Sequence, residues 1–293
     1  MPPMRNNTDI TLVLGGTGKT GSRIVQRLEA RGVPVRIGSR SASPAFDWDD
    51  PATWPAAVDG VASVYLSFYP DLAVPGAPQT IRAFAAQAVA SGVRRIVLLS
   101  GRGEPEAELC EQAVEDSGAE TTMLRSAWFA QNFSEDYLLD PVLEGFVALP
   151  VTDVPEPFID AGDIADAAVA ALTEDGHQGR VYELTGPRLL TFREAVAEIA
   201  AASGREVGFA EVPMDDYAAA LAEHEIPEDL IALFRYLFTE VLDGRNAHTT
   251  DGVRALLGRE PRDFRDYARE VARTGVWSAQ SPAAPMNSVN AVT

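Results

Sequence analysis

Three glycines spaced three residues apart constrain the fold of this chain more than any other feature. Gly15, Gly18 and Gly21 come directly after a continuous apolar run at 10–14, and they open a segment with helical periodicity at 20–31. A buried strand, a glycine-rich turn and a helix together form the unit that binds a dinucleotide pyrophosphate. The glycines permit the tight turn, the close approach of the phosphates and the close packing of the helix on the strand. The sequence therefore predicts a dinucleotide-binding loop at this turn.

Two other interpretations of the glycine segment are open. Its ending, Gly18-Lys19-Thr20, fits the phosphate-binding loop of nucleoside triphosphatases, but that loop needs another glycine where this chain has Val13. The other possibility is a strand–helix turn that binds no ligand. The position of the glycines after a strand favours the dinucleotide loop. We assign to it Gly15, Thr17, Gly18, Lys19, Thr20 and Gly21.

Strand and helix patterns alternate through the first half of the chain. Strands are predicted at 10–14, 33–38, 61–68, 95–100 and 121–125, and helices at 20–31, 51–58, 76–91 and 104–117. This order predicts an α/β fold of the Rossmann type, in which a doubly wound parallel sheet carries helices on both faces. In the second half we expect helices at 163–173 and 191–203, short strands at 181–185 and 207–212, and a helical stretch at 214–243 that is interrupted near Pro227. This half predicts a smaller, mostly helical substrate-binding part.

The end of the second predicted strand indicates which dinucleotide is bound. Sites for NAD carry an acidic residue about 20 positions after the glycines. Here the strand ends in Gly38-Ser39-Arg40, and no acidic residue occurs before Asp47. A hydroxyl and a guanidinium suit the 2′-phosphate of NADP(H), so we assign Ser39 and Arg40 to it. The alternative is that Arg40 is a solvated surface arginine.

These patterns divide the chain into four parts. We expect a flexible N-terminus at 1–8 and an NADP-binding Rossmann core at 9–155. A C-terminal part at 156–277 completes the fold and covers the substrate cleft, and 278–293 lacks periodicity and is expected to be a disordered tail.

Composition and charge exclude several classes of function. The formal net charge of −19 argues against nucleic acid as a partner. No run of about 18 apolar residues and no apolar signal segment occur, so we expect no membrane partner and a cytoplasmic location. Cys110 is the only cysteine, and the three histidines lack metal-ligand spacing, so we expect no metal. A small-molecule substrate and a monomer or homodimer are expected.

Several segments resemble the NmrA-like atypical short-chain dehydrogenase/reductase family. They are the glycine loop, Gly38-Ser39-Arg40, the segment RSAWFAQNF at 125–133 and the segment FIDAGDIA at 158–165. Within the family, the segments at 46–48, 69–72, 100–103 and 240–246 are similar to bacterial relatives of the ergot-alkaloid reductase EasG. The resemblance covers about residues 9 to 277. It implies reduction of an imine by NADPH, although a fungal alkaloid need not be the substrate here.

The resemblance also implies where the ligands bind, at the carboxyl ends of the strands. Further cofactor contacts are then Ser67, Phe68, Ser100, Gly101 and Trp128, with Trp128 near the nicotinamide. Substrate contacts are then Tyr69, Phe129, Asn132, Phe133, Tyr217, Phe234 and Phe238. The alternative for each of these aromatic residues is that it packs the core.

The catalytic pair of ordinary short-chain dehydrogenases is missing. Those enzymes use a tyrosine and a lysine four residues later, and the matching positions here are near Ala107 and Glu111. A protonated iminium ion or a quinone would need little acid catalysis, so direct hydride transfer to such a substrate fits the sequence. Tyr69 or Ser100 could supply a proton where one is needed.

Two questions stay open at this stage. An acidic pocket would help to bind a cation, and Glu111 and Asp136 are the nearest candidates, although each is otherwise interpreted as a solvated helix charge. The function itself has an alternative, a non-catalytic sensor of NADP(H) of the NmrA type. The aromatic-rich second half favours the enzyme.

Overall fold

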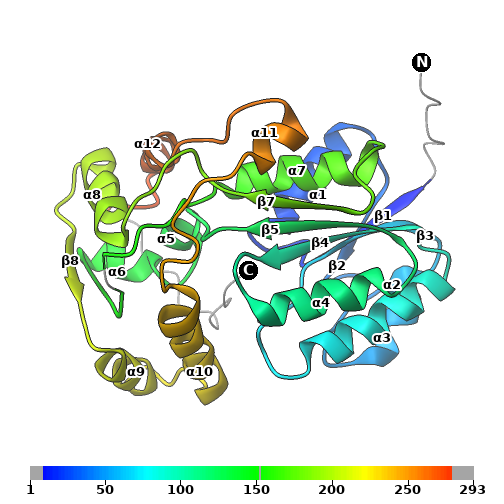
Figure 1. Ribbon diagram of the computed structural model, residues 1–293, viewed down its shortest axis with the longest axis horizontal. Helices are drawn as coiled ribbons and strands as arrows, with labels where there is room; N and C mark the ends of the chain where they lie inside the picture. Colours follow the sequence, from blue (N-terminus) through cyan, green and yellow to red (C-terminus); the bar gives the residue numbers. More distant parts are fainter. Residues whose placement is uncertain (1–8, 152, 279–293) are drawn as a thin grey trace.

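The computed structural model describes residues 9–151 and 153–278, so the expected flexible segment 1–8 and all of the expected tail except Ser278 lie outside the described residues. Six strands form one parallel sheet in the order β2-β1-β3-β4-β5-β7 (Figure 1). Their bounds are Ile10–Leu14 for β1, Val35–Gly38 for β2, Val61–Leu66 for β3, Arg95–Gly101 for β4, Glu120–Ser126 for β5 and Arg180–Leu184 for β7. This is the Rossmann-like parallel sheet that the alternation of strands and helices predicts.

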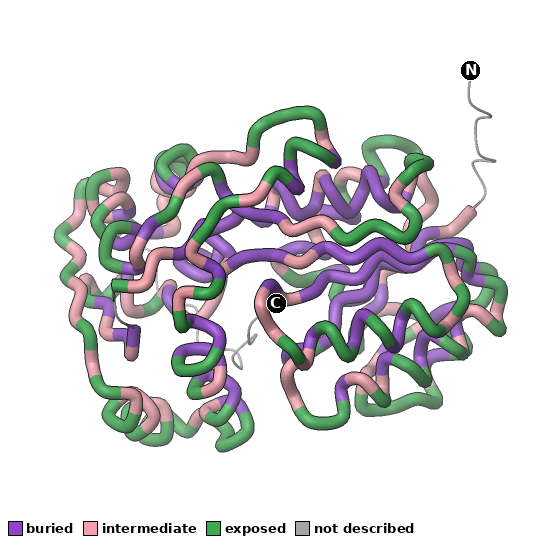
Figure 2. The backbone as a smooth tube through the Cα atoms, viewed as in Figure 1, coloured by how far each residue is buried: buried purple, intermediate pink, exposed green. Residues whose placement is uncertain are grey.

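Helices cover both faces of this sheet (Figure 1). One face carries α1 (Gly21–Ala30), α7 (Ala161–Thr173) and α11 (Gly252–Leu257), and the other carries α2 (Trp54–Val58), α3 (Ala77–Ala90) and α4 (Pro105–Glu115). A single 3-10 turn, η1 (Pro51–Thr53), precedes α2. The inner strands β1, β3 and β4 are buried on both sides, which explains why they read as continuous apolar runs (Figure 2).

The order of the strands reverses between β1 and β3. Chain segments that leave two such strands diverge to opposite sides of the sheet and open a crevice at their carboxyl ends, which is where ligands bind in open α/β sheets. The glycine turn follows β1, and Ser67 follows β3. Both predicted binding segments therefore lie at this crevice.

The remaining elements form a second lobe beside the carboxyl ends of the strands (Figure 1). They are α5 (Asn132–Glu135), α6 (Leu139–Glu144), β6 (Phe146–Leu149), α8 (Phe192–Ser203), β8 (Gly208–Glu211), α9 (Met214–Glu223), α10 (Glu228–Tyr236), the π-helical turn η2 (Leu237–Val241) and α12 (Phe264–Thr274). The expected strand at 207–212 corresponds to β8, which pairs with β6 in a separate two-stranded sheet. The expected helical stretch at 214–243 is interrupted between Glu223 and Glu228, close to Pro227.

The two lobes interleave along the chain. β6 belongs to the second lobe, where it pairs with β8, although it lies before residue 156 in the sequence. α7 and β7 belong to the first lobe although they follow residue 156: β7 completes the large sheet beside β5, and α7 packs on that sheet. The core of the second lobe is a cluster of aromatic and aliphatic side chains that includes Phe133, Phe158, Phe192 and Trp277. In the part of the chain that the structure describes, no helix is long and apolar enough to span a membrane.

Candidate functional site

The three glycines of the turn have distinct structural roles. Gly15 has a φ of +64°, a left-handed conformation that favours glycine. Its carbonyl accepts a hydrogen bond from the amide of Gly18 at 2.8 Å, which closes the turn. A Cβ atom at Gly21 would lie 2.1 Å from the same carbonyl oxygen, so only glycine lets α1 start this close to the turn. Backbone geometry thus explains the glycines at two of the three positions, Gly15 and Gly21.

The turn presents unsatisfied donors to the crevice. The amides of Thr17, Lys19 and Thr20 donate to no acceptor among the residues that the structure describes. The first turn of α1 holds no acidic side chain that would compete for them. A helix N-terminus with free amides is a favourable site for an anion. The geometry therefore fits a dinucleotide pyrophosphate at this turn.

A first pocket, which we call the glycine-loop cleft, runs from this turn across the ends of β1, β2 and β3. It is lined by Gly15, Thr17, Gly18, Lys19, Thr20, Ser22, Gly38, Ser39, Arg40, Phe46, Asp47, Trp48, Asp49, Ser67, Tyr69 and Glu135. Most of the predicted cofactor residues thus lie together. The exceptions are Gly21, which is buried beneath the turn, Phe68, which packs in the core against Trp48, and Ser100, Gly101 and Trp128, which lie elsewhere.

Arg40 stands at the far end of the glycine-loop cleft. Its side chain is exposed, and it forms no ion pair with any residue in the described ranges. An unpaired guanidinium in this position is available to a phosphate group, as expected for NADP(H). Asp47 and Asp49 line the same cleft, so the acidic residues that the sequence places after Arg40 lie nearby.

A second pocket, which we call the inner pocket, lies between the ends of β4 and β5 and the second lobe. Its lining comprises Asp71, Leu72, Leu99, Ser100, Gly101, Arg102, Glu104, Ser126, Ala127, Trp128, Phe129, Asn132, Glu156, Leu237, Val241 and Asn246. It contains Ser100, Gly101 and Trp128 from the predicted cofactor set, and Phe129 and Asn132 from the predicted substrate set. Apolar walls with a few polar groups are typical of a small-molecule site.

Four of the other predicted substrate residues, all of them aromatic, line neither pocket. Phe133, Phe234 and Phe238 are at most 4% exposed and belong to the core of the second lobe, and the ring of Tyr217 packs against the last two. Phe238 stacks behind Trp128, with ring centroids 5.4 Å apart. The core-packing alternative describes the position of these rings, and they reach the inner pocket only through Trp128. Tyr69 lies in the glycine-loop cleft.

Lys19 joins the two pockets. From the glycine turn its Nζ donates to Oδ1 of Asn132 at 3.0 Å and forms an ion pair with Asp136. It also lies 5.7 Å from the centroid of the Phe129 ring. The carboxylate of Asp136 is only 2% exposed, so interpreting it as a solvated helix charge is wrong. A lining residue of the first pocket thus contacts two lining residues of the second.

The carboxylate of a buried ion pair lies on α4, at one of the two positions that the sequence matches to the catalytic tyrosine and lysine. Ala107 is fully buried, and Glu111 accepts hydrogen bonds from the hydroxyl of Ser100 at 2.6 Å and from Arg125 at 2.8 and 2.6 Å. The interpretation of Glu111 as a solvated charge is therefore also wrong. Its carboxylate is neutralised by Arg125, and it holds the Ser100 hydroxyl. Neither position carries a group that could protonate a substrate oxygen as the tyrosine of ordinary family members does.

Three further carboxyl groups line the inner pocket, and the sequence analysis singled out none of them. Burial raises the pKa of Asp71 to about 6. Burial, followed by the negative charges of Asp71 and Glu106, raises the pKa of Glu104 well above its ordinary value. Burial also raises the pKa of Glu156 to about 7, an effect that the charge of Arg102 opposes and that of Asp243 reinforces. The pocket is therefore acidic, and protons bind to it readily near neutral pH.

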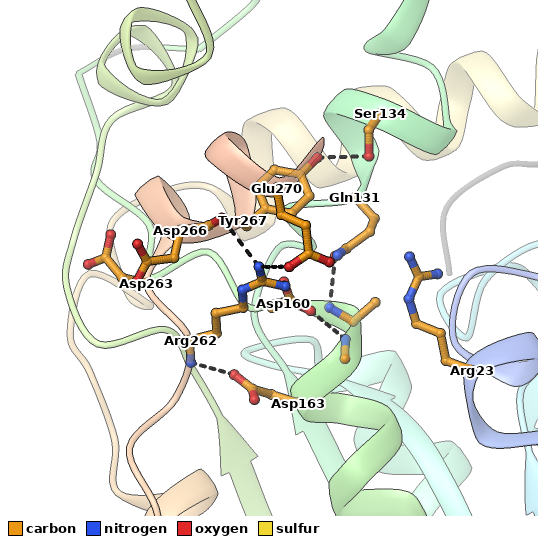
Figure 3. Close-up of polar contacts among 12 residues, drawn as sticks. Arg23, Gln131, Ser134, Asp160, Asp163, Arg262, Asp263, Asp266, Tyr267 and Glu270 are labelled. Carbon is orange, nitrogen blue, oxygen red and sulfur yellow. Dashed lines mark hydrogen bonds and ion pairs between the residues drawn. The ribbon is translucent and has the colours of Figure 1, made fainter. Parts of the chain in front are cut away.

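A polar network fixes the segment that carries Asn132 (Figure 3). Gln131 accepts a hydrogen bond from the amide of Ala161, at the start of α7, and Asp160 caps the same helix. Arg262 bonds to Asp160 at 3.3 Å, and its amide donates to Asp163 at 2.6 Å. The chain leading into α12 is thereby attached to the N-terminus of α7. Asp160 and Asp163, at the N-cap and on the first turn of α7, therefore both bind Arg262.

Sequence relatives cover nearly the whole chain, although no protein-family model matches it. Agroclavine dehydrogenase of Claviceps fusiformis is 32% identical over 91% of this chain and 98% of its own length. Festuclavine dehydrogenase easG of Aspergillus fumigatus is 31% identical over 88% of this chain and 96% of its own length. Prestalk A differentiation protein A of Dictyostelium discoideum is 29% identical over 88% of this chain and 91% of its own length.

Solved structures share the fold. The Citrobacter sp. triphenylmethane reductase complexed with NADP(H) has a TM-score of 0.72 at 20% identity and covers 90% of this chain and 99% of its own. The Escherichia coli quinone oxidoreductase complexed with NADPH has a TM-score of 0.69 at 24% identity, covering 89% and 99%. The negative transcriptional regulator NmrA has a TM-score of 0.70 at 16% identity, covering 94% and 99%.

Proposed function

The chain belongs to the NmrA-like atypical short-chain dehydrogenase/reductase family, alongside the festuclavine and agroclavine dehydrogenases, and on this basis we propose that it is an NADP(H)-dependent reductase of a small cyclic or apolar substrate. The contact of Lys19 with Asn132 and Phe129 carries the proposal. It brings a cleft suited to a dinucleotide next to an apolar pocket suited to a small substrate. Such adjacency is what direct hydride transfer requires.

The glycine-loop cleft would hold the cofactor. The free amides of the turn would bind its pyrophosphate, and Arg40 with Ser39 would bind the 2′-phosphate. When bound, NADPH supplies a hydride. The chain places Ser67 at the end of β3 and Ser100 at the end of β4, neighbouring strands that lead toward the inner pocket. The complexes of the triphenylmethane reductase and the quinone oxidoreductase with NADP(H) and NADPH support this assignment.

We propose an imine, an iminium ion or a quinone as the substrate. The names of the relatives support a reductase of clavine type, and those of the structural neighbours a reductase of dyes or quinones. These substrates suit a site in which Ala107 and the paired Glu111 replace the catalytic tyrosine and lysine. Leu99, Trp128 and Phe129 would hold the substrate against the cofactor and exclude water.

The experiment follows NADPH absorbance during incubation of the protein with cyclic imines, quinones and aldehydes. Turnover of an imine or a quinone that falls at least tenfold in Arg40→Ala at limiting NADPH supports the proposal. An exposed pair remote from both pockets, Arg82 with Asp116, supplies the control variant Arg82→Ala, which should keep full activity. Tight NADPH binding without turnover of any compound would instead support a non-catalytic sensor of NADP(H). The fold that the chain shares with the regulator NmrA is the observation that favours this second function.

A further inference from the structure

Glu156 is the most unusual polar residue outside the glycine turn. It lines the inner pocket, is 0% exposed, and neither carboxylate oxygen has a hydrogen-bond partner among the described residues. Its backbone is held on both sides by Leu190, whose carbonyl accepts from the Glu156 amide at 2.8 Å and whose amide donates to the Glu156 carbonyl at 3.0 Å. The backbone of Glu156 is therefore fixed in place, while both carboxylate oxygens are buried without a hydrogen-bond partner among the described residues.

The nearest positive charge does not satisfy this carboxylate. Arg102 raises the local potential, but its guanidinium donates to Glu183 at 2.9 Å, to the carbonyl of Asn246 at 2.9 Å and to His248 at 2.6 Å. Leaving a buried acceptor unpaired is costly, and an unpaired buried charge costs much more. A ligand that brings a hydrogen-bond donor into the pocket would remove this cost.

Ser126 is a second unpartnered group in the same pocket. It ends β5, beside Gly101 of β4, and its Oγ is buried without a hydrogen-bond partner among the described residues. The residue is 7% exposed. A serine hydroxyl both donates and accepts, whereas a carboxylate only accepts. The two groups together can bind a donor-rich ligand atom.

The surroundings of these two groups select a cation. Asp71, when ionised, adds negative potential to the inner pocket, and Trp128, whose indole can attract a cation, lines the same pocket. A metal ion is disfavoured because no group of three or more His, Cys, Asp or Glu within the described ranges could hold one. The apolar walls instead suit a ring that carries one protonated nitrogen.

We propose that Glu156 and Ser126 bind the protonated nitrogen of a small cyclic iminium or ammonium ion in the inner pocket. The inference rests on the proposed function only in taking this pocket as the substrate site. It adds that Glu156 and Ser126 determine whether the pocket prefers a nitrogen cation over a quinone or another neutral ring. Glu156 would accept the N–H, and Ser126 would complete its hydrogen bonding.

Isothermal titration calorimetry with two matched probes tests the assignment. Tetrahydroisoquinolinium carries a protonated ring nitrogen, and isochroman has the same shape with an ether oxygen instead. Each is titrated into the full-length protein with and without NADP⁺. We expect the wild type to bind the cation at least about tenfold more tightly than the ether, the factor that one charge-assisted hydrogen bond provides.

The variants then locate the effect. Glu156→Gln keeps the shape of the side chain and should abolish the preference for the cation while leaving isochroman binding within about twofold. Ser126→Ala should reduce the preference about threefold or more. Arg82→Ala, which breaks an exposed ion pair with Asp116 outside both pockets, should retain the full preference. Circular dichroism and NADPH binding confirm that each variant is folded.

The outcomes separate this inference from the proposed function. Equal affinity for the two probes, failure of both to bind, or a preference that survives in Glu156→Gln overturns the cation site. If a quinone is reduced while the cation is not preferred, the proposed function stands without the site. If the cation is preferred through Glu156 but NADPH does not bind, the site stands and the reductase is wrong.

Discussion

Nζ of Lys19 lies 3.0 Å from Oδ1 of Asn132, so the glycine turn of the first lobe is attached directly to the first helix of the second. The ion pair of Lys19 with Asp136 strengthens this attachment, because the lysine and aspartate side chains are only 9% and 2% exposed. In a phosphate-binding loop, the lysine at this position points at the bound phosphate. Here Lys19 connects the two lobes instead.

Replacing Lys19 by methionine should therefore lower the free energy of unfolding by about 3 kcal/mol, because the buried Asp136 loses its counter-ion. Urea denaturation measures the change. The double variant Lys19→Met/Asp136→Leu should regain most of the stability, since an apolar pair of similar size needs no counter-ion. Arg82→Met, which breaks an exposed ion pair with Asp116, should cost less than about 1 kcal/mol. A loss from Lys19→Met no larger than this control contradicts the interpretation.

Arg40→Ala should weaken NADPH binding about 10- to 100-fold and leave NADH binding within about twofold, because the guanidinium meets only the 2′-phosphate. Fluorescence titration of each cofactor gives the two dissociation constants. Arg31→Ala removes an exposed arginine outside both pockets and should change neither constant. If the wild type binds the two cofactors equally, the assignment of Ser39 and Arg40 to the 2′-phosphate is wrong.

The glycines of the turn should respond differently to the same substitution. Gly21→Ala places a Cβ 2.1 Å from the carbonyl oxygen of Gly15, so the backbone must move, and we expect a loss of stability of about 1–3 kcal/mol or more. At Gly18 the nearest atom to an added Cβ is the Gly15 carbonyl oxygen at 3.3 Å, a tight contact that a small backbone shift relieves, so Gly18→Ala should cost clearly less stability than Gly21→Ala. It should nevertheless bind NADPH at least tenfold more weakly, because the methyl group meets the pyrophosphate. Thermal unfolding with and without NADPH separates the effects, and equal stabilities for the two variants would refute this account.

The pKa of Glu156 predicts how stability varies with pH. Burial raises this pKa from 4.5 to about 7, so between these values the folded protein holds a proton that the unfolded chain has released. The contribution of the protonated Glu156 side chain to the free energy of unfolding is therefore complete below pH 4.5, and it is lost as the pH rises through about 7. Because Gln cannot ionise, Glu156→Gln should gain up to ~3 kcal/mol relative to the wild type over this range. Urea denaturation in steps of pH measures the difference, and parallel curves for the two proteins would show that Glu156 ionises freely.

The first lobe was predictable because its signals are local. The apolar run of β1, the glycine turn and the amphipathic α1 are each visible within about ten residues. The segment at 132–149, which forms α5, α6 and β6, has no clear period, and β6 gains its strand conformation by pairing with β8. The cap and amphipathic spacing of α12 could have been found, since the side chain of Asp263 accepts from the amide of Arg265 and Phe264, Tyr267 and Ala268 form one buried face.

The candidate site was predictable to the same extent. The glycine-loop cleft consists of residues that follow strands, and the order of strands places them together. The acidic residues of the inner pocket were not predictable, because a charged side chain is ordinarily exposed. Glu156 lies between two prolines, which give no sign that it is buried. It is held inside the protein by backbone pairing with Leu190, which is distant in the sequence. Glu111 is buried because Arg125, on the neighbouring strand β5, neutralises it.

The interleaving of the two lobes has a consequence for how the pockets can open. The backbone crosses between the lobes after β5, after β6, after β7 and on either side of α11. A single flexible joint therefore cannot swing one lobe away from the other. A fragment ending near residue 155 would lack β7 and would expose the edge of β5 that β7 covers. Relative movement of the lobes is therefore limited to small sliding shifts shared by several crossings, or to local displacement of α10 and η2. The protein should accordingly unfold as one cooperative unit.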